Sequence, residues 1–109
     1  MLEQGVAASV QRYLRAVQES GIPVRFGVVF GSQVSGSPDA WSDIDLVVVS
    51  PLFDLGRDRE HIALLWRLTA RVDCRIEPVP CGEQQWETDD SSALSEVARR
   101  HGERILLAA

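Results

Sequence analysis

Two stretches decide the fold: residues 28–32 (Val-Val-Phe-Gly-Ser) and, ten residues further on, residues 43–49 (Asp-Ile-Asp-Leu-Val-Val-Val). Their apolar parts are rich in β-branched and aromatic side chains, which is typical of strands. Residues 31–42 between them are polar and contain glycine and proline, which indicates a loop, or a short helix plus loop. Because its last four residues are all apolar, we expect the second strand to be central and covered on both faces.

Outward from this pair, the chain alternates between helix and strand patterns. Apolar residues at helical spacing predict helices over residues 2–19 and 57–71, and a capping signal predicts a last helix over 93–101. The predicted strands are residues 24–30, 43–50, 74–79 (bounded by Pro78 and Pro80) and 105–107, with a short helical turn at 83–86. The order α-β-β-α-β-α-β predicts an α/β (α+β) protein with a small mixed sheet flanked by helices.

Length and composition limit the classes of protein that are possible. A chain of 109 residues has room for one domain, residues 1–109. It has neither an apolar run near the roughly 20 residues of a membrane span nor a signal-peptide start, so we expect a cytoplasmic protein. A net charge of −5 argues against broad binding of nucleic acid. An acidic protein can still bind a nucleotide if divalent metal ions bridge the negative charges.

The chemistry is predicted where the first strand ends and the second begins. Asp43 and Asp45 are two residues apart, so on a strand their side chains project from the same face. Two carboxylates this close are stable together when a hard divalent ion such as Mg²⁺ lies between them. Gly31 allows a sharp turn and a close approach of ligand, and the Ser32 hydroxyl can hold phosphate oxygens. We therefore expect a phosphate-binding loop facing a metal site.

The pattern Gly31-Ser32-x10-Asp43-x-Asp45 resembles the signature of the nucleotidyltransferases related to DNA polymerase β. The short chain and the run Trp-Ser-Asp-Ile-Asp-Leu at residues 41–46 are similar to the minimal nucleotidyltransferases (MNT family), over roughly residues 28–86. The resemblance implies a polymerase β-like fold and catalysis with two Mg²⁺ ions, for which Mn²⁺ can substitute. It also implies that Asp43 and Asp45 bind both ions, and that Gly31 and Ser32 bind the β- and γ-phosphates.

The family uses a third carboxylate on the next strand, which helps to hold the catalytic metal and can accept the proton of the nucleophile. Asp73 and Glu77 both qualify, because residues four apart on a strand share a face. In minimal relatives an aromatic residue follows this acid after nine positions, and counting back from Trp86 gives Glu77. We choose Glu77 as a catalytic and metal-binding residue, with Asp73 as the alternative.

The chain departs from the family pattern at two positions. Gln33 stands where the family frequently has arginine, and Ser35 stands where it often has a basic residue. The departures leave three alternatives open: weaker nucleotide binding, compensation by Arg25 or Arg75, or reduced activity. Arg75 has the right parity to join Glu77, although a solvent-facing ion pair is an equal alternative.

The resemblance implies a Mg²⁺-dependent transfer of a nucleoside monophosphate, AMP from ATP, to an acceptor hydroxyl. A chain this short has no room for the acceptor-selecting domain of larger relatives, so we expect a homo-oligomer or a separate protein to complete the site. Minimal nucleotidyltransferases are commonly paired with a helical HEPN-domain toxin, which they neutralise as antitoxins and can AMPylate. The alternative is a weak or inactive nucleotidyltransferase fold that neutralises its partner by forming a complex.

Overall fold

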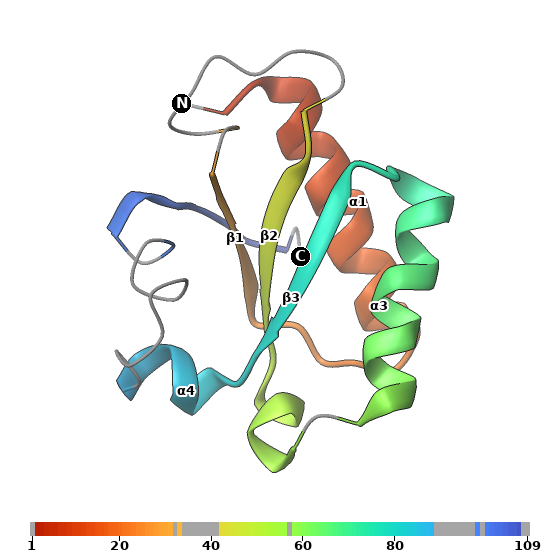
Figure 1. Ribbon diagram of the computed structural model, residues 1–109, viewed down its shortest axis with the longest axis vertical. Coiled ribbons are helices and arrows are strands. Elements are labelled where there is room, and N and C mark those ends of the chain that lie inside the picture. Colours follow the sequence, from red (N-terminus) through yellow and green to blue (C-terminus); the bar gives the residue numbers. More distant parts are fainter. Residues whose placement is uncertain are drawn as a thin grey trace.

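The structure is a computed structural model that describes residues 2–31, 33, 42–56, 58–88, 98 and 100–107 (Figure 1). Its elements, in chain order, are α1 (Gln4–Glu19), β1 (Phe26–Phe30), β2 (Ile44–Val49), the 3₁₀ helix η1 (Pro51–Leu55), α3 (Arg59–Val72), β3 (Ile76–Cys81), α4 (Glu83–Thr88) and β4 (Glu103–Ile105). Ala98, Arg100 and His101 are also helical. The predicted small α/β arrangement with a mixed sheet is confirmed.

The sheet has four strands in the order β3-β2-β1-β4. β1 is antiparallel to both β2 and β4, whereas β2 and β3 are parallel. β1 therefore ends at the edge of the sheet where β2 and β3 begin. This arrangement brings Phe30, the last residue of β1, opposite Asp45, which in turn lies opposite Glu77 of β3.

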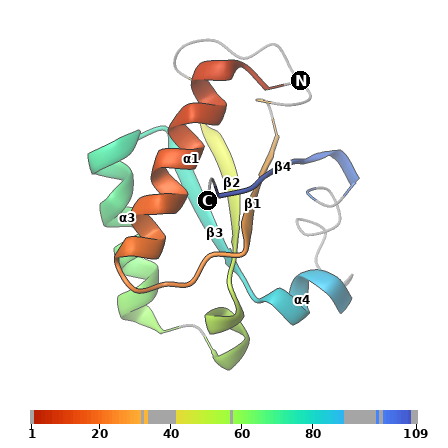
Figure 2. The same cartoon turned by 180° about the vertical axis from the view of Figure 1, so that it is seen from behind.

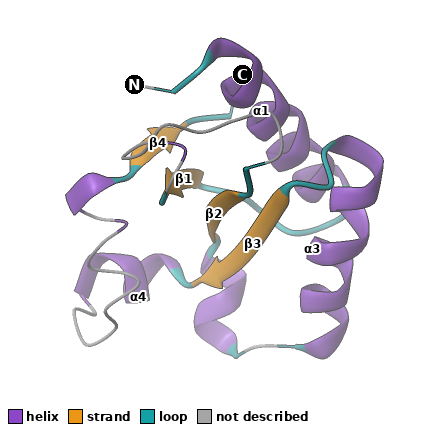
Figure 3. Cartoon of the chain, turned by 45° about the horizontal axis from the view of Figure 1, so that its top comes forward, coloured by secondary structure: helices purple, strands orange, loops and turns teal. Residues whose placement is uncertain are grey.

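The two faces of the sheet carry separate apolar clusters. Helices α1 and α3 cover one face side by side (Figure 2), and Tyr13 and Leu65 of these helices pack there against alternate residues of β2, including Leu46. The other face carries Val47 and its neighbours of the same parity, which pack with Trp86 of α4. Figure 3 shows the sheet between these two groups of helices. The expectation that β2 is central and covered on both faces is confirmed.

The third strand corrects one prediction. Pro78 and Pro80, expected to bound it, lie inside β3. The carbonyl oxygens of Arg75 and Cys81 accept hydrogen bonds from Ile44 at the start of β2 and from Ser50 directly after it, so the odd-numbered residues of this segment face β2. In a parallel pair the alternate residues then direct their backbone nitrogens to the free edge, where a proline loses no hydrogen bond. Sequence alone could not show that β3 is an edge strand.

Other boundaries differ from the prediction in detail. Pro51 ends β2 and also opens η1, which was not predicted; the Ser50 side chain caps this helix by accepting a hydrogen bond from the backbone nitrogen of Leu52. The closing strand β4 begins two residues earlier than the predicted 105–107. The predicted last helix, 93–101, lies mostly outside the described residues. None of the described helices has the length and apolar character needed to cross a membrane.

Candidate active site

Three carboxylates meet at the edge where β1 ends and β2 and β3 begin. Asp45 lies in β2 directly opposite Glu77 in β3, and Asp43 precedes β2 by one residue. Asp45 and Glu77 share the parity of Val47 and Val79, so they project on the face that carries the second apolar cluster. Asp43 is exposed, whereas the other two are half-buried. The strand register thus places Asp45 beside Glu77, and Asp43 lies next to this pair at the start of β2.

The electrostatics of this group are those of crowded acids. The pKa of Glu77 is raised above its ordinary value, mainly because its carboxyl shares a hydrogen bond with Asp45. Burial of Glu77 and the nearby charges of Asp43 and Asp45 raise this pKa further. The ionised form of Glu77 is thus disfavoured unless a positive charge joins the group.

Gly31 continues directly from β1 and adopts a φ of +77°, which side chains other than glycine rarely tolerate. A Cβ at this position would also overlap the Asp45 carboxylate. Glycine is therefore favoured here for two reasons: the backbone conformation strains other residues, and a Cβ would displace the movable carboxylate of Asp45. The second reason was not visible in the sequence, because it depends on Phe30 lying opposite Asp45.

The donor set suits a hard divalent cation, because Asp43, Asp45 and Glu77 offer only carboxylate oxygens. The ligand geometry is not preformed: in the part of the chain that the structure describes, no three acidic, histidine or cysteine side chains are gathered closely enough to hold a metal ion. Ser32, the other predicted phosphate ligand, and Ser35 lie outside the described residues.

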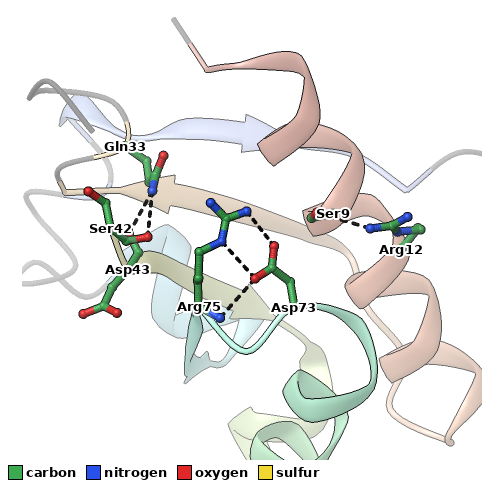
Figure 4. Close-up of polar contacts among 7 residues, drawn as sticks. All are labelled: Ser9, Arg12, Gln33, Ser42, Asp43, Asp73 and Arg75. Atoms are coloured by element: carbon green, nitrogen blue, oxygen red, sulfur yellow. Dashed lines mark hydrogen bonds and ion pairs between the residues drawn. The ribbon is translucent and has the colours of Figure 1, made fainter. Parts of the chain in front are cut away.

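Asp73, the alternative third acid, lies before β3 as the C-cap of α3 and has a different partner (Figure 4). Arg75 donates to both Asp73 oxygens, from Nε to Oδ1 at 3.0 Å and from Nη2 to Oδ2 at 2.7 Å. The backbone nitrogen of Arg75 also donates to Oδ1 at 3.0 Å. These hydrogen bonds, above all the side-chain ones, hold the pKa of Asp73 below its ordinary value. The Asp73 carboxylate is thus already neutralised by the guanidinium of Arg75.

Comparison with models of known protein families identifies the family of this chain. The model of the family described as "Nucleotidyltransferase domain" matches residues 10–85, which include Gly31 and all four acids discussed above. The chain belongs to this family. A search of curated proteins finds no match.

Two solved structures resemble this nucleotidyltransferase. One is a crystal structure of a mutant of the toxin–antitoxin MntA-HpeT, with a TM-score of 0.59 and 17% identity, covering 90% of this chain and 73% of that chain. The other is a crystal structure of a toxin–antitoxin with AMP-PNP, with a TM-score of 0.61, 19% identity and the same coverage of 90% and 73%. At these identities the likeness shows a shared fold.

The two arginines considered as replacements for the missing basic residue have other partners in this nucleotidyltransferase. Arg25 precedes β1, and its Nε lies 2.9 Å from Oε2 of Glu83. Its backbone nitrogen bonds to Val49 at the far end of β2, about 13 Å along the strand from Asp45 at a rise of ~3.3 Å per residue. Arg75 pairs with Asp73, and this ion pair is half-buried. Compensation by Arg25, one of the alternatives left open by the sequence, does not fit this arrangement.

The burial and hydrogen bonds of Gln33 could not be predicted from the sequence. Its side chain is only 5% exposed, and Nε2 donates to the carbonyl oxygens of Ser42 at 3.1 Å and Asp43 at 3.2 Å (Figure 4). In the sequence it was notable only as an absent arginine. A single glutamine in a polar stretch gives no signal of burial, because its partners are backbone atoms that any residue would supply.

Proposed function

We propose that this chain transfers a nucleoside monophosphate, AMP from ATP, to an acceptor hydroxyl in a Mg²⁺-dependent reaction. The observation that carries the proposal is the register of Asp45 opposite Glu77, next to Gly31 and Asp43. It supports a role for these acids because crowded carboxylates are costly to ionise together unless a cation joins them, and such groups are candidates for functional sites. Membership of the nucleotidyltransferase domain family supports the reaction type.

Asp43, Asp45 and Glu77 would hold the divalent ions, and Mn²⁺ would serve as well as Mg²⁺. The chemistry that these ions supply when bound is neutralisation of the triphosphate and stabilisation of an in-line displacement at phosphorus. Gly31 would leave room for phosphate oxygens beside Asp45, and Ser32 would donate its hydroxyl to them.

Glu77 would accept the proton of the acceptor hydroxyl as its oxygen bonds to the α-phosphorus and pyrophosphate leaves. The position of Glu77 in β3 directly opposite Asp45 supports this role.

The acceptor would lie on a partner protein, a helical HEPN-type toxin, with this chain as its antitoxin in the cytoplasm. Support comes from the neighbouring structures, which are toxin–antitoxin proteins, one of them with AMP-PNP. In the mutant, two aspartates two positions apart are replaced by glutamate, the same spacing as Asp43 and Asp45 here.

A second function, neutralisation of the partner without catalysis, is favoured by one observation. Gln33 brings no positive charge to the triphosphate, and its amide is already bonded to Ser42 and Asp43. A chain that binds nucleotide weakly could still neutralise a toxin by covering it.

The test is incubation of the purified chain with α-labelled ATP, Mg²⁺ and a HEPN-domain protein encoded beside this chain, followed by detection of labelled protein. We expect label on the partner with the wild type and none with Asp43→Ala. Glu19→Ala, which removes an exposed carboxylate on α1, is the matched control and should transfer as the wild type does. Absence of labelling by the wild type, or equal labelling by Asp43→Ala, would leave neutralisation by complex formation as the function.

A further inference from the structure

Gln33 bonds to two residues further along the chain, Ser42 nine positions away and Asp43 ten positions away. Its amide nitrogen bonds to the carbonyl oxygens of Ser42 and Asp43, the two residues before β2. Both partners are acceptors, so the position requires a group with two donors on one atom. The carboxamide is largely buried, and these bonds are therefore sheltered from competition by water.

The peptide unit between Asp43 and Ile44 is held at both ends. Its carbonyl oxygen accepts from Gln33, while its N–H, that of Ile44, donates to the Arg75 carbonyl oxygen at 2.8 Å. Asp43 itself lies outside β2, so the strand ladder does not fix it as it fixes Asp45. With the peptide plane fixed, the Cα–Cβ direction of Asp43 is restricted relative to the carboxylates on the strands.

A neutral donor suits this position. An arginine in its place, which the family frequently has, could also donate to both carbonyls but would add a positive charge beside the Asp43 carboxylate. A carboxylate would place acceptors against two carbonyl oxygens. The glutamine amide satisfies both carbonyls without adding charge beside the acids.

We propose that Gln33 is a positioning residue that orients Asp43 for binding of a divalent cation with Asp45 and Glu77. The role in transfer depends on the proposed function, whereas the role in cation binding can be measured without it.

The variants are Gln33→Met, which keeps the size of the side chain and removes both donors, and Gln33→Glu, which keeps its shape and reverses its polarity. Gln11→Met, at an exposed position of α1, is the matched control. Mn²⁺ binding to the nucleotide-free protein is measured by electron paramagnetic resonance. We expect both Gln33 variants to bind about 10–100-fold more weakly, the usual cost of losing an outer-shell partner, and Gln11→Met to bind as the wild type does.

Two further readouts separate positioning from a folding defect. Hydrogen exchange of the Ile44 amide should be faster in Gln33→Met, while exchange at Val29 in the sheet core should not change. Transfer by this variant should recover as Mg²⁺ is raised, because mass action restores occupancy of a weakened site but does not refold a protein.

Wild-type Mn²⁺ affinity in both folded Gln33 variants would overturn the inference, and so would a wild type that binds no Mn²⁺. Binding by the wild type and weakening in the variants, without label transfer by any of them, would uphold the role of Gln33 and count against the proposed enzyme alone.

Discussion

Asp73 and Glu77 lie four residues apart around the start of β3, yet the groups beside them carry opposite charge: positive beside Asp73 and negative beside Glu77. Asp73 accepts three hydrogen bonds from Arg75 and its pKa is lowered. Glu77 faces Asp45 across the strands, with Asp43 nearby, and its pKa is raised. A carboxylate that stabilises the fold is neutralised by the chain itself, whereas one available to a cation is not. The contrast distinguishes a structural acid from a candidate catalytic one.

The largest expected effect is on Mn²⁺ binding and label transfer, when the carboxylates of Glu77 and Asp73 are neutralised one at a time. Glu77→Gln should weaken Mn²⁺ binding by at least the roughly 10–100-fold that loss of an outer-shell partner costs, and should abolish label transfer. Asp73→Asn should leave both at the wild-type level, since its carboxylate serves Arg75. Calorimetric titration with Mn²⁺ and the labelling assay measure the two quantities. If Asp73→Asn lost Mn²⁺ binding and label transfer while Glu77→Gln kept them, Asp73 rather than Glu77 would be the third carboxylate of the site.

Stability should follow the opposite pattern. Asp73→Ala removes hydrogen bonds to a charged, half-buried partner, so the free energy of unfolding should fall by about 1.5–3 kcal/mol. Urea denaturation measures this change, and Glu19→Ala serves as the exposed control. Combining Arg75→Ala with Asp73→Ala should cost less than the sum of the two single substitutions, because each one alone already breaks the pair. Additive losses would show that the two residues act independently.

The contribution of Asp73 should also depend on pH. Because its folded pKa is lowered, its contribution to stability is fully present above the unfolded pKa of about 3.9 and is lost as pH falls through the folded value. The stability difference between wild type and Asp73→Asn should therefore be constant near neutral pH and shrink below about pH 4. Urea denaturation at several pH values tests this, and a difference that persists at the lowest pH would exclude the charge as its cause.

The smallest expected effect is a gain in stability. In the metal-free protein, ionised Glu77 faces Asp45 directly, and like charges opposite each other on a sheet cost about 0.2–1 kcal/mol. Glu77→Gln should therefore raise the free energy of unfolding by about this amount in EDTA. Added Mn²⁺ should stabilise the wild type more than the variant. A loss of stability in EDTA would indicate that Glu77 supports the fold rather than a ligand.

Much of the framework could be predicted from the sequence because it depends on local pattern. The spacing of apolar residues located α1 and α3, and the consecutive apolar residues after Asp45 indicated a strand covered on both faces. The i, i+2 spacing of Asp43 and Asp45 predicted that they project together. Periodicity could not choose between Glu77 and Asp73, since both have the required parity.

The rest depends on contacts between distant residues, which have no local signature. The overlap that a side chain at Gly31 would make with Asp45 follows from the pairing of β1 with β2. The buried position of Gln33 follows from the approach of Ser42 and Asp43. The proline-containing β3 required knowledge of the strand order. The roles of Asp43, Asp45, Glu77, Gly31 and Ser32 in catalysis and binding stay predictions.

The two prolines of β3 also bear on how this protein can assemble. The outer edge of β3 carries the ring nitrogens of Pro78 and Pro80, so a chain laid alongside it would find two hydrogen-bond donors missing in succession. β-strand addition, a common route to both peptide capture and aggregation, is thereby blocked on that side. A partner that approaches β3 finds backbone acceptors but no donors at Pro78 and Pro80, so side chains must supply the missing contacts, and the acids at the start of the strand can be recognised by their charge.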